Sequence, residues 1–482
     1  MALLTPRVVT AQSATEVVTM DATVAEAPAP PVPPVTPLFQ VQCDGCPRRS
    51  VGKAFFQNLM INAFYEVANL VRGQDTAKIT PKTWWANMEQ GWVWDLDDFK
   101  VNQIGHPYQG NNYFNAARAN GLSFWESAGM TAFGSATWEY FGETNHASLN
   151  DLINTTLGGI ALGEMFHRTA WLVRDTQATG RTRLLKEIGA TVIDPITGLN
   201  RFITDDSSRV SAKPADMVPT RLSGIMSAGV LFQGSQTSAF DADGDPFLDV
   251  DLIYGEPATG RSRTPYDAFG VRMRFGGGST FSEARVRGRL LGQPFKNGRF
   301  QFNVLQDYDF VENKAYSFGA QSFEVNVGYT GKLSSRNSVW VGGWGGLTAL
   351  GAVDSLPLGL TEVPVEEPAG EESPGQGVET GPRFYDYGPG GLFGGGAAFA
   401  YDGRRYAVVT YEGRHLYTLD GVRANHLLSR ARIDLMAPLH GPIGIGVSGE
   451  YFDRHTFYQD ADRTRLTFHF PQFRAYLTWS VR

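Results

Sequence analysis

Residues 281–291 read FSEARVRGRLL, and this stretch decides the fold because two kinds of residue alternate along it. One parity is apolar or small and the other is charged: Ala284, Val286, Gly288 and Leu290 against Glu283, Arg285, Arg287 and Arg289. Successive side chains of a β-strand point to opposite faces, so the pattern predicts a sheet with one apolar and one charged face. A strand of a soluble β-sandwich shows the same alternation, so this stretch alone predicts a sheet with two unlike faces and does not predict a membrane barrel.

The alternation recurs from Arg221 to the C-terminus, for example in residues 271–275, 299–304, 323–329, 430–435 and 473–481. We expect about twelve strands of about ten residues, the length that a tilted strand needs to cross a bilayer. They begin near residues 221, 247, 268, 282, 299, 320, 338, 390, 404, 426, 442 and 464. Before Pro471 the apolar residues Leu466, Phe468 and Phe470 lie on the opposite parity, so we expect a β-bulge at Pro471.

The connections favour a transmembrane barrel. Asn297-Gly298 and Asp402-Gly403 suit short hairpin turns, whereas residues 353–384 form a long acidic loop rich in Pro and Gly. Short turns at one end and long loops at the other are typical of outer-membrane barrels. Arg285 and Arg287 are then candidate binding residues on the lumen face, where arginines can pair with Glu283, Glu324, Asp434 and Glu450. The alternative is a large soluble β-domain.

Composition bounds the function without deciding it. The chain has 482 residues and a net charge of −7, which gives no reason to expect a nucleic acid as a partner. No run of eighteen apolar residues occurs, so a membrane-spanning helix is not expected. The start of the chain resembles a truncated secretory signal, and a Pro-rich linker follows it up to residue 37. Cys43 and Cys46 are the only cysteines, and a local disulfide is the use we expect for them in an exported protein.

Residues 38–195 predict a helical domain, and residues 196–220 a connector to the barrel at 221–482. Helices are expected at 52–71, 81–89, 109–119, 122–141, 147–172 and 181–190, with Ser148 capping the fifth. The fold class is thus α+β: a helical domain followed by an antiparallel transmembrane β-barrel of about twelve strands. The helical domain is expected on the periplasmic side or lodged against the barrel.

Unusual polar residues are concentrated in the helical domain. Helical spacing places Asp151 and Asn154 on one face, and Glu164 and His167 on one face beside the small-residue stretch at 158–163. One interpretation is structural, with these residues fixing helix contacts. A second is an acid/base site in which His106 acts with Glu139 or Asp151 on a lipid. A third, a metal site, is disfavoured because Glu164-x-x-His167 occurs once and carboxylate-bridged di-iron sites need the motif twice; we expect neither a metal nor a cofactor.

A family resemblance rests on residues 102–110 (NQIGHPYQG), followed by Ala117-Arg118, Trp138-Glu139, Asn150-Asp151, Gly158-Gly159 and Gly163-Glu164. Over about residues 80–175 this pattern resembles the bacterial family called domain of unknown function 3943. The resemblance implies an envelope protein of Gram-negative bacteria with a β-rich C-terminal part, and it assigns no activity. Further candidate binding residues in this region are Asn102, Tyr108, Arg118, Asn150, Asn154, Glu164 and His167.

Two weaker motifs complete the sequence. Glu139, Asp151, Asn154, Gly159 and Gly163 resemble the pattern of VanZ-like membrane proteins, which hints at helices next to lipid. Residues 241–245 (DADGD) resemble the start of a calcium loop, but an acidic turn is favoured because Pro246 follows and Leu252 stands where an EF-hand has Glu.

The predicted function is an outer-membrane barrel protein with a periplasmic helical part and an envelope role as a pore, transporter or anchor. The alternative is a barrel-linked hydrolase or transferase acting on a lipid or cell-wall precursor through His106, Glu139 and Asp151. Outer-membrane lipid is the expected partner, and a small molecule or lipid is the expected class of ligand.

Overall fold

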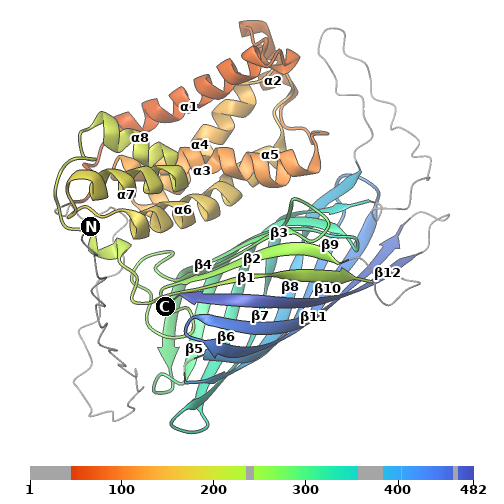
Figure 1. The fold of residues 1–482 in the computed structure, drawn as a ribbon. Coiled ribbons are helices and arrows are strands. Elements are labelled where there is room, and N and C mark those ends of the chain that lie inside the picture. Colours follow the sequence, from red (N-terminus) through yellow and green to blue (C-terminus); the bar gives the residue numbers. More distant parts are fainter. Residues whose placement is uncertain (1–44, 235–243, 356–383, 403, 460–464, 482) are drawn as a thin grey trace, which may run out of the picture.

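The computed structural model describes residues 45–234, 244–355, 384–402, 404–459 and 465–481. These residues form a closed antiparallel barrel of twelve strands and a helical domain beside it (Figure 1). The α+β fold and the strand number predicted from the sequence are confirmed. The DADGD motif lies partly outside the described residues.

Each strand pairs with its neighbours in the sequence, and β1 pairs with β12 to close the barrel. The strands are β1 Leu222–Gln233, β2 Asp245–Tyr254, β3 Phe269–Gly276, β4 Phe281–Phe295, β5 Phe300–Glu312, β6 Ser317–Lys332, β7 Asn337–Asp354, β8 Tyr385–Tyr401, β9 Arg404–Tyr417, β10 Ala424–His440, β11 Ile443–Tyr458 and β12 Leu466–Val481.

The two ends of the barrel differ. Residues 296–299, 333–336 and 441–442 are short turns at the end where β1 begins and β12 finishes, which we call the turn end. The opposite end, which we call the loop end, carries residues 313–316, 418–423 and the long segment between β7 and β8. The long connection between β7 and β8 lies at the loop end, as expected, but residues 255–268 form a long connection at the turn end, and residues 313–316 at the loop end are as short as the turns.

The expected bulge at Pro471 is wrong. β12 pairs with β11 in one unbroken register through Pro471, which lies opposite Tyr451. Phe470 points into the barrel and packs with Phe452 and Tyr316 in a buried apolar cluster near the loop end. The parity of the apolar residues changes because the interior itself becomes apolar there, not because the strand shifts.

The helices are α1 Val51–Val71, α2 Pro81–Gln90, α3 His106–Ala119, α4 Phe124–Phe141, α5 Leu149–Ile153, α6 Gly159–Val173, α7 Gly180–Ile193 and α8 Pro195–Ile203. Short π-helical segments, η2 Val101–Gly105 and η3 Asn154–Gly158, lead into α3 and α6. The expected helix at 147–172 is therefore a run of α5, η3 and α6, and Ser148 caps it by accepting a hydrogen bond from Asp151 N. Helix α8 occupies residues that the sequence predicts as connector; Asp194 caps it and Pro195 opens its first turn.

The helical domain packs against the outer wall of the barrel (Figure 1). Ile160, Ala161 and Met165 of α6 share a buried cluster with the outward-facing Val286 of β4 and Tyr308 of β5. The Tyr308 hydroxyl donates to Gln103 O at 2.7 Å, and Gln306 Nε2 donates to Leu157 O at 2.9 Å. The helices thus lie beside the barrel, neither inside it nor beneath it.

Close packing within the domain explains its glycines. Helices α3 and α6 meet at Gly110 and Gly159, where a Cβ added to Gly110 would lie 1.8 Å from Thr155 O and 2.9 Å from Gly159 Cα. Only glycine lets two backbones approach this closely. In the part of the chain that the structure describes, no helix combines the length and mean hydropathy that crossing a membrane requires.

Candidate functional site

Three predicted residues meet where the first turn of α3 faces α4 and α5. Segment η2 leads directly into α3. Pro107, the second residue of α3, has no N–H to donate back to η2, and Gln103 O accepts a hydrogen bond from the Tyr308 hydroxyl instead. Glu139 comes from the last turns of α4 and Asp151 from the first turn of α5. The candidate ligand atoms of His106, Glu139 and Asp151 all lie within 4.8 Å of one another, and all three side chains are buried.

The imidazole of His106 lies between acceptors. Its Nε2 is 3.5 Å from Asp151 Oδ1 and 3.8 Å from Asp97 Oδ2, while its Nδ1 is 3.2 Å from Thr155 Oγ1. Glu139 accepts a hydrogen bond from Ser148 N at 2.8 Å. A carboxylate beside one ring nitrogen and a hydroxyl beside the other fix the orientation of a histidine, as an acid/base group requires.

Asp95 extends the cluster from the loop before η2. Asn102 Nδ2 donates to Asp95 Oδ1 at 3.1 Å and Asn150 Nδ2 donates to the same oxygen at 2.7 Å. Asp95 and Asp151 also hydrogen-bond to each other, so one of these two carboxyl groups carries a proton.

The pKa values of two carboxyl groups in the cluster, Asp95 and Glu143, shift in opposite directions. Burial alone would raise the pKa of Asp95, but hydrogen bonds from Asp151, Asn150 and Asn102 together with the charge of His106 lower it. Burial raises the pKa of Glu143 from 4.5 to about 7, although Trp138 Nε1 donates a hydrogen bond to it at 2.7 Å. The site therefore pairs a readily ionised carboxyl with one that is about half protonated near pH 7.

The barrel closes one side of the cluster. Asn102 Nδ2 donates to the Tyr385 hydroxyl at 2.7 Å, and Asn150 Nδ2 lies 3.4 Å from the Tyr387 hydroxyl. Tyr385 in turn donates to the backbone oxygen of Asp97. Both tyrosines lie at the start of β8, so the site lies at the loop end of the outer wall.

This arrangement can do two kinds of chemistry. His106 and its carboxylates can transfer a proton, and the three converging side chains of His106, Glu139 and Asp151 have the ligand types and spacing to hold one divalent ion. Within the described residues, no Lys or Arg nitrogen comes within 4 Å of the carboxylates of Glu139, Glu143 or Asp151.

The remaining predicted residues of the helical domain lie elsewhere. Asn154 is buried with neither amide atom hydrogen-bonded, and Tyr108 is half exposed against Phe166. Arg118 Nε pairs with Glu164 at 2.9 Å, and Arg168 contacts the same carboxylate.

His167 pairs instead with Asp194, at 3.2 Å, so it does not share a site with Glu164. The structure therefore separates these two residues, which the sequence places on one helix face. Their local partners give them structural roles that hold α6 to α3 and α8.

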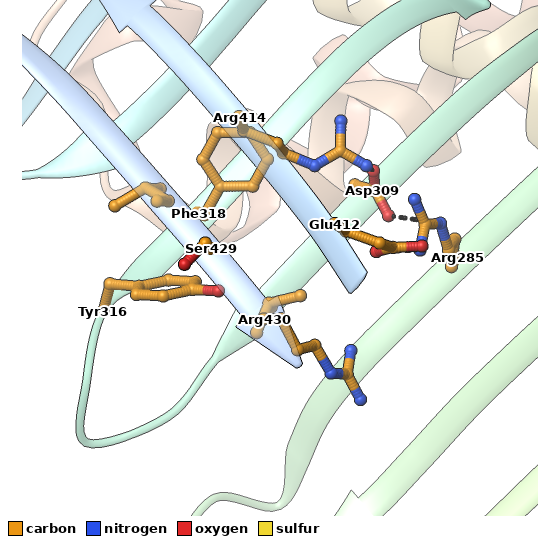
Figure 2. Close-up of a pocket in the computed structure, with 10 residues that line it drawn as sticks. Arg285, Asp309, Tyr316, Phe318, Glu412, Arg414, Ser429 and Arg430 are labelled. Carbon is orange, nitrogen blue, oxygen red and sulfur yellow. Dashed lines mark hydrogen bonds and ion pairs between the residues drawn. The ribbon is translucent and has the colours of Figure 1, made fainter. Parts of the chain in front are cut away.

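Arg285 and Arg287 point into the lumen, as predicted, where three arginines meet four carboxylates. Arg285 Nη1 lies 2.7 Å from Glu412, Arg287 Nη2 lies 3.4 Å from Glu324, and Arg414 pairs with Asp309. Asp307 contacts all three arginines. Figure 2 shows Arg285, Asp309, Glu412 and Arg414 converging beside a cavity of about 30 Å³, which is large enough for about one water.

A second group of lumen charges lies farther around the barrel. It comprises four arginines and four carboxylates: Arg274, Arg430, Arg432 and Arg474 with Asp249, Glu283, Asp434 and Glu450. Arg474 and Glu450 are 1% and 3% exposed, so water does not reach them as it would in an open channel. The predicted pairing of lumen arginines with Glu283, Glu324, Asp434 and Glu450 is confirmed.

Sequence reasoning missed Asp95, Asp97, Thr155, Tyr385 and Tyr387. The two aspartates directly follow two tryptophans in WVWDLDD, which is a usable sign of a buried polar loop. The tyrosines are more than 230 residues from Asn150 in the chain, and nothing local marks them as its partners.

Comparison with known protein families gives a match in the helical domain. Residues 91–196 match the family model described as Domain of unknown function (DUF3943), which confirms the predicted resemblance. The likeness to VanZ-like proteins stays a prediction. No curated protein matches this sequence.

Solved structures named as porins or outer-membrane proteins align with about half of this chain. Similar solved structures include the NanC porin (6% identity, 53% of this chain and 98% of that one, TM-score 0.29) and the KdgM porin in complex with disordered oligogalacturonate (7%, 54% and 99%, 0.25). A third is a loop-deletion mutant of OmpT, an outer-membrane protein of Vibrio cholerae (10%, 54% and 99%, 0.21).

Proposed function

We propose that this chain is an outer-membrane protein whose barrel is a closed anchor and whose helical domain carries the functional site. The observation that carries the proposal is the reversed polarity of the barrel, with charge inside and apolar side chains outside. Ile433, Ile445 and Leu477 are exposed on the outer wall, whereas the lumen arginines Arg430, Arg432 and Arg474 are buried. In water this arrangement would cost about 25 cal/mol for each Å² of exposed apolar surface, and a bilayer removes that cost.

A closed lumen argues for anchoring and against a pore. The ion-paired groups fill the middle of the barrel, and the cluster of Phe452, Phe470 and Tyr316 fills its loop end. A second cavity there, beside Arg274 and Glu283, has only about 10 Å³. Porin lumens, by contrast, are water-filled and leave their lining side chains exposed.

The test is to reconstitute the full chain in lipid vesicles. We expect a gel band that shifts on boiling, as closed barrels give, and no uptake of small sugars by the vesicles. Sugar uptake at porin-like rates would contradict the closed anchor, and a soluble protein without a heat-dependent band shift would contradict the barrel in the membrane.

A second candidate function is a hydrolase or transferase that acts on a lipid or cell-wall precursor. The convergence of His106, Glu139 and Asp151 within 4.8 Å favours it, because a purely structural contact does not need three titratable groups. The location of this cluster at the barrel wall would bring it close to lipid substrates.

This candidate is tested by mass spectrometry of outer-membrane lipids incubated with the protein in vesicles. His106→Ala should abolish any turnover while the barrel still shifts on boiling. Tyr108→Ala, two residues away on the same helix and outside the cluster, should retain it. Equal loss of folding in His106→Ala, Glu139→Ala and Asp151→Ala would instead assign the cluster a structural role.

A further inference from the structure

The helical domain shows the same reversed polarity as the barrel, with polar side chains inside and apolar side chains outside. Helix α1 turns its large apolar side chains outward: Phe55, Phe56, Leu59, Met60, Phe64, Val67, Leu70 and Val71 are all exposed. The side chain of Asn58, on its inner face, is fully buried. A helix at the surface of a soluble domain shows the opposite arrangement, with its polar face in water.

The other helices repeat this pattern. Helix α4 buries a polar stripe with a period of four, Ser127, Thr131, Ser135 and Glu139. Helix α7 exposes Leu184, Leu185, Ile188 and Val192 and buries Arg183 and Glu187, and helix α8 exposes Leu199, Phe202 and Ile203 and buries Asn200 and Arg201. Some of the buried polar groups are paired, as with Arg201 and Glu187 at 2.9 Å, whereas Ser127 Oγ and Ser135 Oγ have no hydrogen-bond partner among the described residues. An apolar surface of this extent indicates a partner that is itself apolar.

The helices also run the full height of the barrel wall. Asn102, just before α3, contacts Tyr385 at the loop end, and Phe124, just after α3, stacks on Tyr266 next to the turn-end start of β3. Helix α1 runs back the other way, since Ser50 N bonds to Asn120 O near the end of α3. Twenty-one residues of α helix are about 31 Å long, which covers the apolar band of about 25 Å of an outer-membrane barrel.

Exposed tryptophans mark both edges of this apolar surface. Trp125 lies in the first turn of α4 at the turn end. Trp85 lies in α2, and its neighbour Trp84 donates a hydrogen bond to Phe141 O at the end of α4. Tryptophan is enriched where a bilayer meets water, so this placement matches two membrane interfaces.

We infer that the helical domain lies within the bilayer beside the barrel, with lipid acyl chains as the partner of its outer surface. The inference rests on the proposed outer-membrane location of the barrel and deepens it. Acyl chains are favoured over a protein partner because exposed apolar side chains lie on α1, α7 and α8 alike and also on the outer wall of the barrel. Figure 1 shows these helices beside that wall. The buried polar side chains of α4, α7 and α8 named above face the interior of the domain, and Arg201 of α8 is satisfied there by Glu187 of α7.

The inference is tested with nitroxide spin labels on single cysteines in the full chain, reconstituted in vesicles of outer-membrane lipid. Labels replace Phe64 on α1 and Leu185 on α7, each of which is 69% exposed. Ile445 on the outer wall of β11 is the lipid control, and Ser334 in a turn at the turn end is the water control. Labelling is done without reductant because Cys46 is disulfide-bonded.

Collisions with oxygen, which dissolves in lipid, are compared with collisions with a water-soluble nickel complex. We expect Phe64→Cys and Leu185→Cys to give the high oxygen-to-nickel ratio of Ile445→Cys, several-fold above that of Ser334→Cys. A ratio like that of Ser334→Cys, or exclusion of both reagents together with crosslinked dimers, overturns the inference. If Ile445→Cys also contacts water, the outer-membrane location of the barrel itself has failed; the heat-dependent band shift confirms folding of each variant.

Discussion

Removing one carboxylate from the lumen should destabilise the barrel strongly, and Glu450 is the sharpest choice. Its two oxygens lie 2.7 Å from Arg430, 3.4 Å from Arg274, 3.6 Å from Arg432 and 2.5 Å from Arg474. Glu450→Gln keeps the shape and leaves four buried arginines with three carboxylates. Breaking a buried pair from one side costs about 3–5 kcal/mol, because the partner charge is left uncompensated away from water.

The assay is urea unfolding of the reconstituted protein, followed by the loss of the heat-shifted band. Asp251→Asn is the matched control: Asp251 pairs with Arg272 at 2.8 Å, but both side chains are about 30% exposed near the turn end. Solvent screening should keep its cost to about 1 kcal/mol or less. Equal and small losses for both variants would show that water reaches Glu450, and would refute the closed lumen.

Three further predictions concern the helical domain, each followed by amide hydrogen exchange in vesicles. Gly110→Ala should lower the free energy of unfolding by about 1–3 kcal/mol, because its Cβ would clash with Thr155 O. Gly129→Ala has open space around it and should raise the free energy of unfolding by about 0.5–1 kcal/mol. The opposite order of the two variants would contradict the close crossing of α3 and α6. Burial holds the pKa of Glu143 at about 7, so the folded state keeps a proton that the unfolded state releases near pH 4.5. The free energy of unfolding should therefore fall as pH rises from about 4.5 to about 7. Glu143→Gln should abolish this pH dependence. Phe64→Lys should cost about 2–4 kcal/mol in a bilayer, and a cost below about 0.5 kcal/mol would indicate that this position faces water.

The barrel was predictable because each strand separates two unlike environments. Charged and apolar side chains alternate wherever one face contacts charge and the other avoids water, as at Arg285 and Val286, and this period of two is visible without any partner strand. The prediction failed at Pro471, where Phe470 faces an apolar interior and the two environments become alike. The alternation arises because the two faces of a strand contact different environments, so it no longer predicts the register where both environments are apolar.

The functional site was predictable only in its helical part. His106, Glu139 and Asp151 stand out as polar residues among small and apolar neighbours, and the structure brings them together. Tyr385 and Tyr387 approach them only because the barrel wall folds against η2, and their sequence context is that of any strand. Contacts between the two parts of the chain depend on tertiary docking, which residue spacing does not encode.

The same ambiguity explains why the sequence could not place the helices. Val286 alternates with arginines just as a lipid-facing residue would, yet in the structure α6 covers it. A lipid tail and a helix face both exclude water, so outward apolar residues of β4 fit either neighbour equally well. The decisive information lies in the helices themselves: Arg183 and Glu187 are buried while Leu185 is exposed, an order that water would reverse. The barrel and the helical domain both place polar groups inside and apolar groups outside. The physical cause is the same for both, because lipid surrounds the outer surface of each.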